Sequence, residues 1–188
     1  MRKNFGPKTW SYCEPVFIIG TYNEDGTANA MNAAWAGIYD TNKVFVSLSS
    51  HKTTDNFKRT KAFTISFGTK DELVASDYVG IVSGNKEPNK VEKAGWHYKR
   101  SEFVDAPYFE ELKMSLDCSV DSIQEDEDGI KLIGNILNVS ADESILTDGK
   151  IDPLKLKPLI FDPVNNKYLV ATEVAGDAFK SGLLIRNK

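Results

Sequence analysis

A strict alternation of apolar and polar residues between Leu112 and Asp121 constrains the fold of this chain more than any other feature. A period of two places the apolar side chains on one face of a β-strand and the polar ones on the other. The apolar face would hold Leu112, Met114, Leu116, Cys118 and Val120. An acidic turn at 125–129 and an apolar run at 130–139 follow. This succession predicts a long β-hairpin with a solvated tip.

Other segments also have the composition of β-strands, being rich in β-branched and aromatic residues. They span residues 15–22, 27–35, 43–49, 62–67, 158–161 and 168–171. The Asp25-Gly26 step joins the first two as a hairpin turn, because glycine tolerates positive φ. About seven strands, with no regular exchange of strand and helix, favour a closed antiparallel barrel, a mainly β fold with minor α.

Helices are expected to be few and short. One is predicted over 53–61, with a hydroxyl N-cap, Asp55 in the first turn and basic residues at its end. A second is predicted over 71–82, where Leu73, Val74, Val79 and Val82 share a face. Between Ser83 and Pro107 the pattern breaks, which indicates a long excursion from the barrel.

Composition and charge exclude several classes of function. The 188 residues carry a formal net charge of −4, whereas a nucleic-acid binder usually needs a dense basic face. The two cysteines, Cys13 and Cys118, and the two histidines, His51 and His97, are too few for a disulfide scaffold or a histidine-rich metal centre. No apolar run follows the basic residues at 2–8, so we expect no secretory signal there, and the longest apolar run, 16–19, is too short to span a bilayer. We expect one cytoplasmic domain over 1–188, with no membrane partner.

The segment from Val46 to Asn56 is the first candidate for chemistry. A strand ends there, hydroxyl side chains and Lys52 follow, and a helix begins. Free N–H groups at a helix start, hydroxyl donors and an ammonium together bind anions, above all phosphate. A capped helix on a polar loop explains the same residues equally well. His51 is as compatible with a solvated loop as with a phosphate contact.

The segment from Thr27 to Gly37 is the second candidate, because its alanines and asparagines are unusual in a strand. Small side chains let a flat ligand approach the backbone. Close packing against a helix or another subunit accounts for the same composition.

Together these segments resemble the flavoredoxin type of the flavin reductase-like, FMN-binding split-barrel proteins. The resemblance is carried by Asn29-Ala30-Met31-Asn32-Ala33-Ala34-Trp35 and by residues 15–26, 46–48, 53–56, 61–64, 77–84, 105–108 and 141–144. It implies a Greek-key split β-barrel with two or three short helices, a homodimer, and FMN bound non-covalently near the dimer interface.

The resemblance also implies which residues contact FMN. Those along the isoalloxazine ring would be Asn29, Ala30, Met31, Asn32, Ala33, Ala34 and Trp35. Those at the ribityl chain or ring edge would be Ser47, Leu48 and Ser49, and those at the phosphate Ser50, Lys52, Thr53 and Thr54. Ser83, Gly84 and Lys90 would help to close the site. The family pattern has an arginine just after Leu48; this chain lacks it, and Lys52 is the candidate substitute.

The function implied is that of an oxidoreductase that moves electrons from NADH, NADPH or another donor through FMN to a small-molecule or protein acceptor. The flavin carries the redox chemistry, so no side chain is expected as a catalytic acid or base. The alternative is an FMN-binding reservoir or sensor without turnover; a pyridoxamine phosphate oxidase fits the segments less well. The segment Trp96-His97-Tyr98 is a candidate for a lid over the flavin, for stacking with nicotinamide or for dimer packing, and Cys118 is a candidate for a buried structural thiol.

Overall fold

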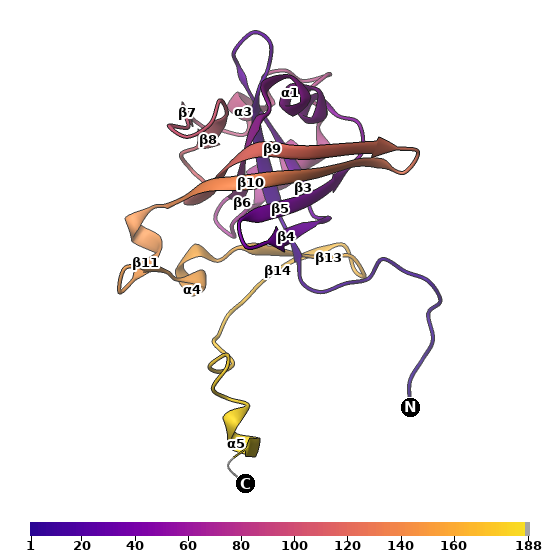
Figure 1. The fold of residues 1–188 in the computed structure, drawn as a ribbon, viewed down its shortest axis with the longest axis vertical. Helices are drawn as coiled ribbons and strands as arrows, with labels where there is room; N and C mark the ends of the chain where they lie inside the picture. The colour runs from indigo at the N-terminus through magenta and orange to yellow at the C-terminus, as the bar shows by residue number, and fades with distance from the viewer. Residues whose placement is uncertain (187–188) are drawn as a thin grey trace.

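The alternating segment forms the long hairpin that the sequence predicts. Strand β9 (Met114–Asp126) pairs antiparallel with β10 (Gly129–Ala141) in the computed structural model, which describes residues 1–186. Strand β9 also pairs with β6 (Ala62–Phe67), and β10 with β5 (Lys43–Leu48). The hairpin therefore sits in the middle of a seven-stranded antiparallel sheet of order β3-β2-β6-β9-β10-β5-β4 (Figure 1).

The remaining strands complete this sheet and form three small ones. The seven-stranded sheet also contains β2 (Phe17–Tyr22), β3 (Ala28–Ala33) and β4 (Ala36–Asp40). The small sheets contain β1 (Glu14–Pro15), β13 (Leu159–Asp162) and β14 (Lys167–Val170); β7 (Tyr98–Arg100) and β8 (Pro107–Phe109); and β11 (Leu146–Thr147) and β12 (Lys150–Ile151). The prediction of a mainly β, antiparallel fold is confirmed.

The helices are short, as expected, but more numerous than the two or three predicted. They are α1 (Lys52–Thr60), α2 (Leu73–Ile81), α3 (Lys90–Lys93), α4 (Pro153–Leu156) and α5 (Leu183–Arg186), with a 3-10 turn at Glu143–Ile145. The N-cap of α1 is His51 rather than a hydroxyl residue. In α2 the expected apolar face is wrong, because Val74 is 80% exposed while Val79 is fully buried. Among residues 1–186, no helix is long and apolar enough to cross a membrane.

Two hydrophobic clusters stabilise the fold. The inner one lies inside the curled sheet and includes Phe63, Ile65, Leu116 and Cys118. Burial raises the pKa of the Cys118 thiol to about 12, so this side chain packs as a hydrophobic group. The outer cluster lies between β2, β3 and the segment that follows α2.

Trp96 belongs to the outer cluster, so its own side chain is not available for a lid, for stacking or for dimer packing, and these roles stay predictions for the exposed His97 and Tyr98. The Trp96 side chain is 4% exposed, packs against Phe109 and donates a hydrogen bond from Nε1 to Glu72 Oε2 at 2.8 Å. The excursion from 83 to 107 is thus not structureless: it carries α3 and β7 and covers the outer face of the sheet.

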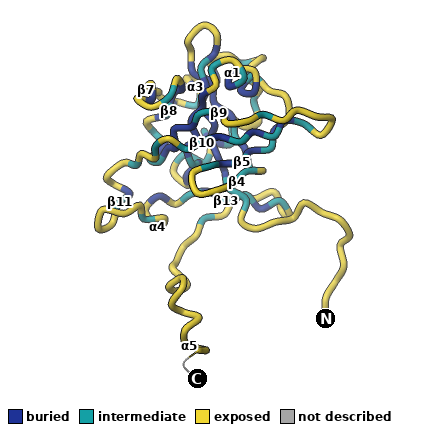
Figure 2. The backbone as a smooth tube through the Cα atoms, viewed as in Figure 1, coloured by how far each residue is buried: buried dark blue, intermediate teal, exposed yellow. Residues whose placement is uncertain are grey.

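The two ends of the chain extend away from the barrel. The segments before β1 and after β14 run outward as exposed tubes (Figure 2). Large apolar side chains on them face solvent, among them Phe5, Trp10, Phe179, Leu184 and Ile185. Within one chain these arms bury little of their apolar surface.

Gly20 lets the excursion approach the barrel. A Cβ on this residue would lie 2.5 Å from the Pro107 carbonyl oxygen and 2.5 Å from Thr64 Oγ1. Thr64 Oγ1 itself donates to the Pro107 oxygen at 2.5 Å. The methyl group of an alanine would therefore displace backbone as well as a buried hydrogen bond.

We expect Gly20→Ala to lower the free energy of unfolding by about 1–3 kcal/mol, as overpacking of a dense core does. Urea denaturation followed by circular dichroism measures the change. Gly37→Ala is the matched control, since no atom lies within 4 Å of its would-be Cβ. Equal denaturation midpoints for the two variants would contradict this account of Gly20.

Candidate functional site

Two adjoining cavities lie where β3, the start of α1 and α2 meet. The larger has a volume of about 450 Å³ and the smaller about 200 Å³. Met31, Asn32, His51, Gly80 and Ile81 line both, so the two form one two-lobed site. We call them the large lobe and the small lobe.

The large lobe is mostly apolar, and two of its lining residues, Trp35 and Ile81, are largely exposed to solvent. Met31, Ala33, Ala34 and Trp35 come from β3 and the residues after it, and Ser47, Leu48 and Ser49 from the end of β5. Phe161 and Tyr168 line it from the three-stranded sheet. Small and aromatic side chains on several sides suit a flat aromatic ligand.

A hydrogen bond fastens the wall of the large lobe that β14 supplies. Tyr168 donates from its hydroxyl to Asp77 Oδ1 at 2.7 Å and so joins β14 to α2. Burial and this bond to a carboxylate raise the pKa of Tyr168 to about 12. The hydroxyl therefore stays protonated at neutral pH and remains a hydrogen-bond donor.

Strand β3 packs closely enough to explain its alanines and asparagines. A Cβ on Gly80 would lie 2.8 Å from the Asn32 Cβ, so α2 approaches the strand directly. Asn29 donates from Nδ2 to Thr53 Oγ1 at 2.7 Å and so fixes the strand to the start of α1. The strand thus packs against helices, as one interpretation of its composition required, and it also lines the cavities, while the approach of a flat ligand to it stays a prediction.

The small lobe has the hydrogen-bond donors of an anion site. Thr54 Oγ1 accepts from the His51 N–H at 2.9 Å and donates to the His51 carbonyl at 2.6 Å, which fixes the first turn of α1. The backbone N–H groups of Lys52 and Thr53 have no acceptor within residues 1–186. Free N–H groups and the helix dipole at this end favour an anion.

The charges around the small lobe have one sign. Lys52 and Lys90 line it, and none of its lining residues is acidic. Lys90 is 3% exposed and donates from Nζ to the carbonyls of Val79 and Val82, at 2.9 Å each. Burial lowers the pKa of Lys90 to about 8. A bound anion would supply the counter-charge that this ammonium does not find among the described residues.

Gly84 belongs to the same lobe. A Cβ on this residue would lie 2.4 Å from Asn29 Oδ1 and 3.4 Å from Lys52 Cβ. The turn after α2 therefore passes directly over the start of α1, and Ser83, Gly84 and Lys90, which the family resemblance assigns to closing the site, all line the small lobe.

Most of the residues expected to contact a cofactor line the two lobes. They are Asn29, Met31, Asn32, Ala33, Ala34, Trp35, Ser47, Leu48, Ser49, Lys52, Thr53, Ser83, Gly84 and Lys90. Three predicted residues do not. Ala30 packs into the outer cluster, Ser50 is exposed outside both lobes, and Thr54 uses its hydroxyl to cap α1.

Sequence reasoning missed the residues that α2 and the C-terminal sheet contribute. These are Asp77, Val79, Gly80, Ile81, Val82, Phe161 and Tyr168. It also missed Val16, which lies between β1 and β2, and it left His51 between two roles. The apolar positions of α2 indicated a helix but not which side faces β3. Asp77 and Tyr168 are 91 positions apart, and no local pattern pairs them.

The described residues show no metal site. In the part of the chain from 1 to 186, no group of three or more His, Cys, Asp or Glu side chains is placed to hold a metal ion.

The two-lobed site consists of an apolar lobe that suits a flat ring, joined to a cationic lobe that suits an anionic end. An elongated ligand with both parts fits this arrangement.

Comparison with known proteins agrees with this geometry. Residues 9–163 match the model of the family described as flavin reductase like domain. The flavoredoxin of Desulfovibrio vulgaris (Miyazaki F) superposes with a TM-score of 0.92 and 36% identity, covering 97% of this chain and all of that one. The flavoredoxin from Methanosarcina acetivorans gives 0.87 and 28%, covering 98% and 99%.

A structure of lower sequence identity shares the same fold. An FMN-binding domain of flavin reductases-like enzyme from Shewanella baltica OS155 shares the fold with a TM-score of 0.75 and 20% identity, covering 87% of this chain and 89% of that one. The predictions of a split barrel and of a flavoredoxin-type relative are thereby confirmed. This chain belongs to the flavin reductase like domain family, in its flavoredoxin type.

Proposed function

We propose that this protein is an oxidoreductase that binds FMN non-covalently and passes electrons from NADH, NADPH or another carrier to an acceptor. The observation that carries the proposal is the two-lobed site, in which an acid-free lobe with two lysines at a helix start adjoins a larger apolar lobe. The Shewanella baltica relative is described as FMN-binding, which supports the choice of cofactor.

The residues present fit FMN part by part. The N–H groups of Lys52 and Thr53 and the ammonium groups of Lys52 and Lys90 would hold the phosphate. The ring would lie in the large lobe against Ala33 and Ala34 at the end of β3 and against Trp35. When bound, FMN supplies hydride and electron transfer at its ring system, which the protein side chains cannot provide.

The role of the chain is then to hold the ring, exclude water and leave one side open. Phe161 and Tyr168 cover the large lobe from one direction, and Tyr168 is kept in place by Asp77. Trp35, 54% exposed, stands at the open side. We propose that a reductant or acceptor approaches there.

We also propose that a second copy of the chain covers part of this open side. Trp35 and Ile81 line the large lobe and yet are largely exposed, as are Ile38 and Tyr39 on the edge strand β4. Large apolar side chains gathered at the mouth of a site are typical of an interface. Two-fold pairing would cover both sites in the same way.

The phosphate contact predicts a preference for FMN over riboflavin. Charge-assisted hydrogen bonds to the phosphate should make FMN bind at least ~100-fold more tightly than riboflavin. Lys52→Ala should reduce that ratio by about tenfold while leaving riboflavin affinity unchanged. Quenching of flavin fluorescence during titration gives both dissociation constants.

Lys86→Ala is the matched control, since Lys86 is exposed and lies outside both lobes. It removes the same charge from a nearby segment and should leave the ratio intact. Equal affinity of the native protein for the two flavins would contradict the assignment of the small lobe to phosphate.

Electron transfer distinguishes an enzyme from a flavin reservoir or sensor. With FMN bound, anaerobic mixing with NADH or NADPH should bleach the flavin absorption band, and an added acceptor should restore it. Stopped-flow absorption spectroscopy measures both phases. If neither nucleotide nor a reduced protein carrier bleaches the band while FMN stays bound, the protein binds flavin without turnover.

Burial of Lys90 predicts that FMN affinity depends on pH. With a pKa of about 8, Lys90 is protonated below that pH and neutral above it, so affinity for the phosphate dianion should fall as pH rises. We expect the dissociation constant to rise about fivefold between about pH 7 and pH 9.

Lys90→Arg should remove this dependence, because a guanidinium stays charged throughout the range. The free energy of unfolding of the native protein should rise over the same interval, since only the folded Lys90 has lost its proton. An affinity that stays flat with pH in the native protein would mean that Lys90 does not interact with the phosphate.

A further inference from the structure

The chain exposes more surface than a compact protein of its mass. Its solvent-accessible surface is 11738 Å² for a mass of 20.9 kDa. A folded monomer of this mass exposes about 9,000 Å². The excess of about 2,700 Å² is enough for the share of one partner in even a large homodimer interface, roughly 1,000–2,500 Å².

The C-terminal arm, residues 171–186, contributes to this excess. Every residue in it is exposed, and Figure 2 shows it leaving the barrel directly after β14. Val174, Phe179 and Leu184 are among its large apolar side chains that face solvent, and Phe179 is fully exposed. Its two acidic and two basic side chains cancel in charge. Such a segment is stabilised by an apolar surface that it can cover.

Helix α2 offers an apolar surface that the described residues do not cover. Val79 packs into the outer cluster, whereas Val74 and Ile81, two turns apart on one side of the helix, face solvent. A helix that is apolar on more than one side is normally buried on each of them. Trp35 and Ile38 are also exposed, and Trp35 lines the large lobe together with Ile81. We call Trp35, Ile38, Val74 and Ile81 the apolar patch.

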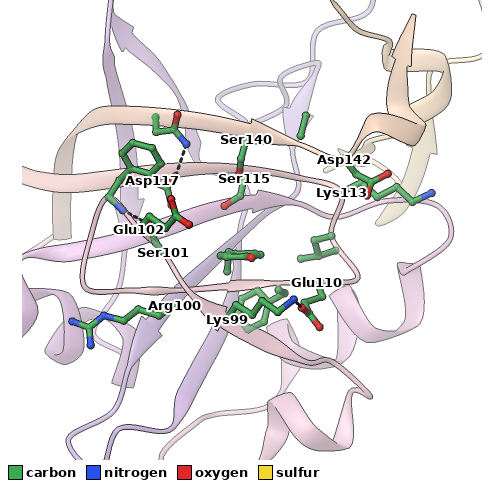
Figure 3. A pocket seen from close by; sticks show the side chains of 16 residues that line it. Lys99, Arg100, Ser101, Glu102, Glu110, Lys113, Ser115, Asp117, Ser140 and Asp142 are labelled. Atoms are coloured by element: carbon green, nitrogen blue, oxygen red, sulfur yellow. Dashed lines mark hydrogen bonds and ion pairs between the residues drawn. The ribbon is translucent and has the colours of Figure 1, made fainter. Parts of the chain in front are cut away.

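A charged cavity elsewhere on the molecule does not suit the arm. Its volume is about 560 Å³, and none of its lining residues lines either lobe. Four of its lining residues are acidic and three are basic, among them Glu102, Glu110, Lys99 and Lys113 (Figure 3). An apolar segment lying there would remove these charges from water without pairing them, which costs free energy. The arm therefore fits the apolar patch better than this cavity.

The arm begins close to the apolar patch but runs away from it. It continues β14, whose Tyr168 lines the same lobe as Trp35 and Ile81. Figure 1 shows the arm extending from β14 away from its own barrel. A two-fold axis beside the patch would place the start of each arm next to the patch of the other copy. Each arm could then lie on the other subunit without a change in the barrel.

We propose that the C-terminal arm of each copy crosses to its partner and covers the partner's apolar patch, at the mouth of the partner's large lobe. This inference rests on the proposed function, which already places a second copy at the open side of the site. It adds that the large lobe of one subunit is closed by a segment of the other. Exclusion of water from the ring position then depends on dimer formation.

Sedimentation velocity on the full-length protein tests the arm and the patch. The native protein should sediment as a dimer at micromolar concentration. Phe179→Asp and Val74→Asp should each raise the dissociation constant of the dimer at least ~100-fold, because two-fold pairing removes each apolar contact twice. Both side chains are exposed in the single chain, so the barrel does not need them to fold. Phe103→Asp is the matched control, since Phe103 is exposed but lies outside the arm and the patch.

Cross-linking shows which chain the arm covers. A variant carrying Val74→Cys and Lys180→Cys, with the exposed Cys13 changed to Ser, is treated with a short bis-maleimide. Cys118 is buried and its thiol has a raised pKa, so it does not react. Arm exchange should give a covalent dimer on a denaturing gel. An arm that folds back onto its own barrel would instead give an internally linked monomer, which mass spectrometry identifies.

The proposal is overturned if the native protein is a monomer, if Phe179→Asp dimerises as tightly as Phe103→Asp, or if no covalent dimer forms. Titration of the same samples with FMN tests the proposed function separately. A monomer that binds FMN overturns the arm exchange alone. A cross-linked dimer that binds no FMN confirms the arm exchange and contradicts the proposed function.

Discussion

The hydrogen-bonded pairing of β9 with β10 is the constraint on which the rest of the structure depends. The hairpin joins two groups of earlier strands, because β9 pairs with β6, which pairs with β2, and β10 pairs with β5, which pairs with β4. Without it, the ribbon β3-β2-β6 and the ribbon β5-β4 would not be joined into one sheet. With it, apolar side chains from both halves meet in one inner cluster, and the start of α1 comes to lie beside β3.

Much of this framework could be predicted from the sequence, because its strands obey local rules. The boundaries of β6 agree with the prediction, and those of β5 differ by one residue. Strand β4 was missed, since Ile38 and Tyr39 are exposed apolar residues that break any alternation of buried and exposed positions. The burial of Ser115 and Asp117 could not be predicted, because their cover comes from a distant part of the chain whose path no local pattern shows.

The candidate site divides in the same way. Its small lobe lies where β5 ends and α1 begins. Such a place can be recognised from the types of a few neighbouring residues in the sequence. The position of Lys90 followed from family resemblance rather than from its surroundings, and the structure adds the physical reason for its unusual burial. The pairing of Asp77 with Tyr168 depends on how the small C-terminal sheet docks, which only the folded chain shows.

Helix α2 supplies residues to both lobes and is held at two points, by Tyr168 near its middle and by Lys90 at its end. Any tilt of this helix would widen or narrow both lobes together. Lys90 is hydrogen-bonded to the end of α2, so an anion that displaced Lys90 would also displace this helix, which borders the large lobe. The nine-residue helix α2 therefore links the two lobes. If an elongated ligand bound with one end in each lobe, a change in how the small lobe holds one end would alter the space around the other end.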